Sequence, residues 1–169
     1  MEFLGSLHPK IIHFPIALFI VYTLLETVGL IFKKEVFTKG AYIILVLGIL
    51  GAFAAVLTGN QAEGMWKNWT NVSKLLVEEH ETYATITLWY FFGLTILRTM
   101  FVINVEIKKK FSQHVMKMKI GFVIFALAGC YFVYETGEHG GKLIYQHGVG
   151  TSIDKQPQQI QNEDEDNLH

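Results

Sequence analysis

The sequence predicts an all-α protein, a four-helix transmembrane bundle with its N- and C-termini outside, on the periplasmic side. Hydrophobic residues make up 51% of the 169 residues, and charged residues reach only 17%, below the roughly 25% of soluble domains. The apolar residues are gathered into four long runs. A formal net charge of −1 and a single Cys exclude a basic nucleic-acid-binding protein, a disulfide scaffold and a CxxC metal site.

The four runs are the expected membrane spans. A helix needs about 20 apolar residues to cross a hydrocarbon core of roughly 30 Å, and the runs meet or approach that length. They do not alternate with period two, and backbone groups in lipid must bond within the segment, so helices are favoured over strands. The first run is followed by no small-x-small cleavage site, so we expect it to remain in the mature protein. The expected spans are residues 11–32, 41–59, 82–105 and 120–136.

The four spans divide the chain into a transmembrane domain and a polar C-terminal tail. Residues 1–150 form the four-helix transmembrane domain. The tail, residues 151–169, is polar and acidic and is expected to be disordered unless a partner orders it.

Lysines in the loops predict the orientation of the bundle. The loop after the first span and the loop after the third lie on one side of the membrane, and lysine in short loops marks the cytoplasmic face. Both termini and a long outer loop, residues 60–81, therefore lie outside. We expect a multi-pass protein of a bacterial inner membrane. The lysines are Lys33, Lys34 and Lys39 in the first loop, and Lys108, Lys109, Lys110, Lys117 and Lys119 in the third.

Five of the seven histidines collect in one layer at the outer ends of the spans. They come from segments far apart in the sequence, and imidazole is the usual nitrogen ligand of haem, copper, zinc and iron. Two axial histidines can hold a b-type haem between helices. Each histidine alone has an ordinary alternative, a bond to a carbonyl or to water. The five residues are His8, His13, His80, His139 and His147.

The preferred axial ligands of a haem are His13 and His80, and His139 with His147 could hold a second haem in the same layer. Carboxylates next to ligand histidines often accept the second ring N–H and fix the tautomer. Glu81 follows His80 and Glu138 precedes His139, so these two are the candidates for that role. Solvated acids at the headgroup boundary are the alternative.

Glu26 and Arg98 are charges deep inside the spans. Counting about 1.5 Å per residue from the outer ends places both roughly 22–24 Å down, at similar depth. They either pair with each other or Arg98 extends to the headgroups.

Two motifs carry a family resemblance. One is Leu7-His8-Pro9 followed by His13-Phe14-Pro15, and the other is the run from Gly140 to Gly150. With the His80-Glu81 pair they resemble the bacterial four-helix membrane protein family catalogued as domain of unknown function 2231, over roughly residues 4–152. The resemblance implies a redox setting, because members are fused to, or encoded beside, Rieske and c-type cytochrome modules. The matching motif positions are His8, His13, His80, Gly141, His147 and Gly148, whereas His139 matches no motif position.

Three functional hypotheses follow. The first is a b-type cytochrome-like electron-transfer protein with one or two haems at the periplasmic face. It would pass electrons between quinol, or a membrane complex, and a periplasmic c-type cytochrome or Rieske-type protein. The second is a non-haem protein that binds Cu or Zn through the same histidines. The third is a cofactor-free structural subunit of a membrane redox complex. No Ser-His-Asp arrangement or phosphate loop is visible, so a non-catalytic role is favoured over an enzyme.

Overall fold

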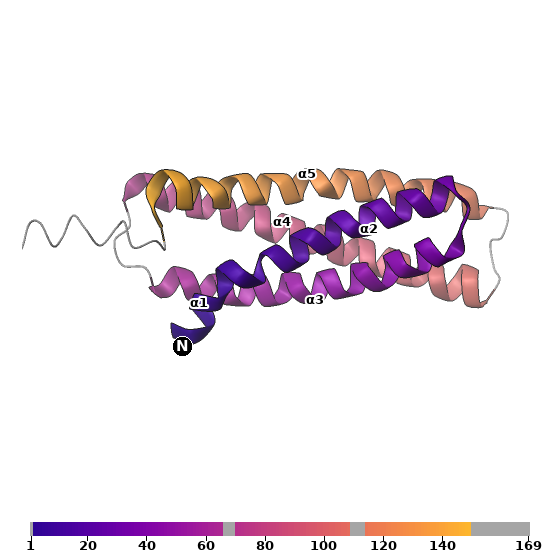
Figure 1. Cartoon of the computed structure of the whole chain (residues 1–169), viewed down its shortest axis with the longest axis horizontal. Coiled ribbons are helices and arrows are strands. Elements are labelled where there is room, and N and C mark those ends of the chain that lie inside the picture. The colour runs from indigo at the N-terminus through magenta and orange to yellow at the C-terminus, as the bar shows by residue number, and fades with distance from the viewer. Residues whose placement is uncertain (1, 66–69, 109–113, 150–169) are drawn as a thin grey trace, which may run out of the picture.

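The computed structural model describes residues 2–65, 70–108 and 114–149, which form an elongated helical bundle (Figure 1). Four helical stretches are long and apolar enough to cross a membrane, namely Gly5–Ile31, Glu35–Met65, Val72–Val105 and Val115–His147. This confirms the expected all-α transmembrane fold, and the described residues contain no strand. In chain order the helices are α1 (Glu2–Ile11), α2 (His13–Ile31), α3 (Glu35–Met65), α4 (Asn71–Phe101), the π-helix η1 (Val102–Ile107) and α5 (Val115–His147).

The helices extend beyond the expected spans. α3 and α4 have 31 residues each. At a rise of about 1.5 Å per residue, each helix is longer than a hydrocarbon core of about 30 Å is thick. The expectation of a long outer loop over residues 60–81 is wrong, because residues 60–65 continue α3 and residues 71–81 open α4.

Thr70 starts α4 with a reciprocal cap, in which the Ser73 N–H donates to Thr70 Oγ1 and the Thr70 N–H donates to Ser73 Oγ. The tail, residues 151–169, lies outside the described residues.

The first span bends between α1 and α2. Pro15 has no N–H to donate to the carbonyl of Ile11, four residues earlier, and its ring crowds that carbonyl. Beyond the bend α1 leaves the direction of α2 and runs against the end of α3 (Figure 1). The two backbones approach closely there, since a Cβ added at Gly5 would lie 3.1 Å from the Cα of Ala62. With this bend, His8 lies against α3, whereas the side chain of His13 is exposed.

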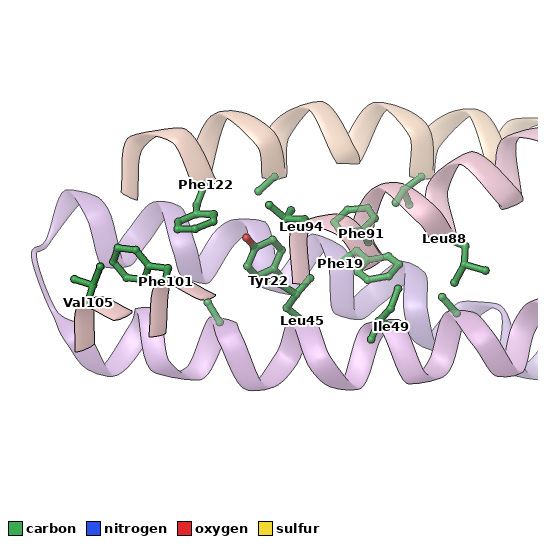
Figure 2. Close-up of a cluster of buried hydrophobic side chains, with 14 residues drawn as sticks. Phe19, Tyr22, Leu45, Ile49, Leu88, Phe91, Leu94, Phe101, Val105 and Phe122 are labelled. Carbon is green, nitrogen blue, oxygen red and sulfur yellow. The ribbon is translucent and has the colours of Figure 1, made fainter. Parts of the chain in front are cut away.

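The centre of the bundle is a stack of two aromatic rings. Phe19 of α2 and Phe91 of α4 lie with centroids 3.8 Å apart and planes within 5°, surrounded by other buried apolar side chains (Figure 2). A glycine of a neighbouring helix lies directly beside each ring. A Cβ at Gly48 of α3 would lie 2.8 Å from the Phe19 ring, and one at Gly129 of α5 would lie 2.5 Å from the Phe91 ring. Small residues at these two positions let neighbouring helices close on the stack.

The two hairpins, α2–α3 and α4–α5, are equivalent halves. The Thr23 and Thr95 hydroxyls each donate to the carbonyl of the stacked phenylalanine one turn earlier, at 2.9 and 2.7 Å. α2 and α4 run in the same direction (Figure 1), so the halves are related by an approximate two-fold axis along the bundle, passing between Phe19 and Phe91. Four residues of the first segment recur 72 positions later, as His8/His80, Phe19/Phe91, Thr23/Thr95 and Thr27/Thr99, and at the same offset Glu26 is matched by Arg98. Two glycines of α3 recur 81 positions later in α5, as Gly48/Gly129 and Gly59/Gly140, and at the same offset Ala55 is matched by Thr136.

Replacing Gly129 by alanine is expected to lower the free energy of unfolding by about 1–3 kcal/mol, because the new methyl group overpacks the core. The Phe91 ring is fully buried against Phe19 and has no room to retreat. Gly137→Ala on the same helix is the matched control, since a Cβ there meets nothing within 4 Å. Both changes gain the same helix propensity. Unfolding in mixed micelles measures the difference, and equal stabilities of the two variants would contradict this account of the stack.

Candidate cofactor site

His8 is held against α3. Its Nδ1 atom lies 3.1 Å from the carbonyl oxygen of Ala55 and 3.2 Å from Thr58 Oγ1. The ring is half-buried and packs on the helix backbone, because a Cβ at Gly59 would lie 3.0 Å from its Cε1 atom. A glycine at this position is therefore what allows the ring to approach the backbone of α3 this closely.

His80 is held against α5 in the same manner. Its Nδ1 atom lies 3.0 Å from the carbonyl oxygen of Thr136, and a Cβ at Gly140 would lie 3.0 Å from its Cε1 atom. In both halves the accepting carbonyl stands four residues before the glycine. The two histidines are thus equivalent under the two-fold relation.

These bonds fix the tautomer of both rings. A carbonyl oxygen can only accept, so each Nδ1 carries the proton and donates it. In a neutral imidazole the other nitrogen, Nε2, then keeps its lone pair for a metal. Within the described parts of the chain, neither Nε2 atom has a hydrogen-bond partner. A backbone carbonyl on the second ring nitrogen is the arrangement that orients ligand histidines in metal sites.

His13, which was expected to be an axial ligand together with His80, lies in a different setting. It opens α2 just after the bend, and its side chain is exposed. Its equivalent position in the second half, 72 residues later, is Thr85 and not a histidine. The structure therefore matches His80 with His8 rather than with His13.

His139 is bound on both sides of its ring. Nδ1 lies 2.8 Å from the Glu135 carbonyl oxygen, Nε2 lies 3.5 Å from Glu79 Oε2, and the ring stacks on Tyr83 with centroids 4.8 Å apart. His147 is the last residue of the same helix, eight residues further and about 12 Å along the axis. Two histidines so far apart on one helix cannot flank one iron, so this geometry gives no support to a second haem between them.

Glu81 and Glu138, expected beside ligand histidines, have other polar partners in the structure. Glu138 pairs with Lys142 on the surface of α5 at 3.4 Å, and Glu81 interacts with Glu63 of α3. Glu79 and Glu135 contact His139 instead. The i, i+4 spacing of Glu135 and His139 on one helix was a usable signal for that contact.

Glu26 of α2 and Arg98 of α4 meet on the side of the Phe19–Phe91 stack that faces away from His8 and His80. Arg98 Nε lies 3.6 Å from Glu26 Oε2, and both side chains are essentially inaccessible, at 0% and 1% exposure. Arg98 Nη2 also donates to the Thr38 carbonyl oxygen at 3.2 Å. The guanidinium lies over the Phe101 ring, 4.8 Å from its centroid. Arg98 therefore pairs inside the bundle rather than reaching the headgroups.

No group of three or more His, Cys, Asp or Glu side chains gathers as a metal site among the residues that the structure describes. A tetrahedral Zn or Cu centre needs at least three protein ligands. The histidine end of the bundle offers a two-histidine donor set instead.

Comparison with known proteins identifies a family for this chain. No curated protein and no solved structure matches the chain. A family model does match residues 5–153, almost all of the helical domain, and its description is "Predicted membrane protein (DUF2231)". The resemblance seen in the histidine and glycine motifs is thereby confirmed, and the chain belongs to the DUF2231 family of predicted membrane proteins.

Proposed function

We propose that this protein is a b-type cytochrome-like electron carrier that holds one haem between His8 and His80. The observation that carries the proposal is the equivalence of these two rings, each of which donates from Nδ1 to a main-chain carbonyl and packs on a glycine. A haem takes only two axial protein ligands, and two neutral imidazoles are a common pair. The donor chemistry of the site therefore fits this cofactor.

The residues of the chain would prepare the site before any cofactor binds. The Ala55 and Thr136 carbonyls orient the two imidazoles and raise their basicity. Gly59 and Gly140 let both rings lie low on their neighbouring helices. A bound haem would supply a one-electron Fe(III)/Fe(II) couple at this end of the bundle.

The position of the site favours electron exchange at one face of the membrane. Lysine-rich loops lie at the opposite end, and by the charge rule that end is cytoplasmic. The histidine end would then face the periplasm of a bacterial inner membrane. Partners on that face would be a c-type cytochrome, a Rieske-type protein or another subunit of a membrane complex, with quinol as a possible donor. A single layer of ligands does not connect the two faces, so electrons would not cross the membrane through this chain.

Absorption spectra of the detergent-purified protein, produced with ample haem and recorded oxidised and reduced, test the proposal. We expect a Soret band that shifts on reduction, with sharp α and β bands, and one haem per chain. A folded, monodisperse protein that takes up no haem would contradict it. Metal analysis would then separate a Cu or Zn protein from a cofactor-free subunit.

A further inference from the structure

An apolar groove runs between α4–η1 and α5 at the end of the bundle opposite to the histidines. Its volume is about 330 Å³, at the lower end of the range of about 300–1,000 Å³ for ligand pockets. The lining is almost entirely apolar, and the π-helix η1 forms part of its wall. Phe101, Val105 and Phe122 mark this end in Figure 2. Six of the lining residues are Leu97, Phe101 and Asn104 on one side, and Met118, Gly121 and Phe125 on the other.

Two lysines stand one helical turn from residues that line this groove. Lys108 is the C-cap residue of η1, one turn beyond Asn104, and Lys117 lies four residues before Gly121 on α5, on the same side of the helix. Both lysine side chains are exposed. The apolar groove is thus continued by a pair of positive charges at the point where the spans end.

We propose that this groove binds an anionic phospholipid, with one acyl chain along the groove and the phosphate between Lys108 and Lys117. Two observations support this occupant. The groove lies within segments that cross the membrane, so acyl chains are its natural surroundings. The two lysines complement a negative headgroup, and a basic patch beside a gap between transmembrane helices is a recurrent lipid site. The proposal does not depend on the haem.

Gly121 makes the groove testable. A Cβ at this position meets nothing within 4 Å, and the residue lines the groove. A leucine there would enter the space that the acyl chain needs from an unobstructed Cβ position. Gly137→Leu is the matched control, because it is an equally unobstructed glycine on the same helix away from the groove.

The experiment titrates the detergent-purified full chain with phosphatidylglycerol and with phosphatidylcholine of the same acyl chains, and follows binding by native mass spectrometry. Phosphatidylglycerol is expected to bind tighter. The Lys108→Gln/Lys117→Gln variant should bind it about 10- to 30-fold more weakly, as about 1 kcal/mol per lysine implies. Gly121→Leu should lose the bound lipid, while Gly137→Leu and Lys33→Gln/Lys34→Gln should retain it.

Three results would overturn the proposal. Equal binding of both phospholipids would show that the lysines do not select a charged headgroup. Unchanged binding by Gly121→Leu would place the lipid elsewhere. A dimer in lipid-free detergent that Gly121→Leu dissociates would show that a second copy of the chain, and not a lipid, fills the groove.

Discussion

The His8→Gln variant is expected to lose the low-spin haem spectrum completely, and His80→Gln is expected to lose it as well. Each ring would be one of only two axial ligands of the iron. In both rings the Nδ1 bond to a main-chain carbonyl orients the ring and leaves Nε2 to bind iron. Glutamine keeps a donor for that carbonyl and a similar helix propensity, so the bundle should stay folded. Visible spectra, haem content and helical circular dichroism of each purified variant measure this effect.

The controls for these variants are other histidines of the same chain. His13→Gln is expected to keep the spectrum, because its side chain is exposed and lies beyond the bend. His114→Gln changes an exposed histidine at the opposite end of the bundle and tests for a general effect of losing an imidazole. Loss of the spectrum in His13→Gln with retention in His8→Gln would restore the ligand pair that the sequence first indicated.

The sequence was sufficient to predict the four helices, because the length of an apolar run and the thickness of a bilayer can be compared by counting residues. The sequence was not sufficient to predict the residues at which these helices begin and end. The polar residues 60–65 and 71–81 read as a loop, yet they continue α3 and α4 past the expected membrane boundary. The Thr70–Ser73 cap was a local signal for the start of α4.

The depth of a histidine along its span does not distinguish His8 from His13 as a candidate ligand. Placing histidines by depth assumed a straight first helix, whereas the bend before Pro15 turns α1 onto α3. One signal was present in the sequence. His8, Phe19 and Thr23 recur 72 residues later as His80, Phe91 and Thr95, while His13 has no such partner. This internal repeat favours His8 over His13 on the amino-acid sequence alone.

Breaking the buried ion pair is expected to have the largest effect on stability. Arg98→Met leaves the Glu26 carboxylate without its charged partner in a fully buried setting, and removing one member of a buried pair costs about 3–5 kcal/mol. It also removes the donor to the Thr38 carbonyl. Unfolding by SDS titration in mixed micelles measures the change. Lys39→Met is the matched control, because the exposed Lys39–Glu35 pair should contribute no more than about 1 kcal/mol.

The double variant Glu26→Leu/Arg98→Met decides what the pair is for. Removing both charges avoids an uncompensated carboxylate, so its stability should return to within about 1 kcal/mol of the wild type or exceed it. Glu26 and Arg98 occupy equivalent positions in the two halves. If both positions held Glu, or both held Arg, two like charges would face each other at the two-fold axis. Opposite charges therefore make α2–α3 and α4–α5 complementary to each other and not to themselves. If the double variant is as unstable as Arg98→Met, the pair is needed for stability itself, and its role in selecting the partner half is contradicted.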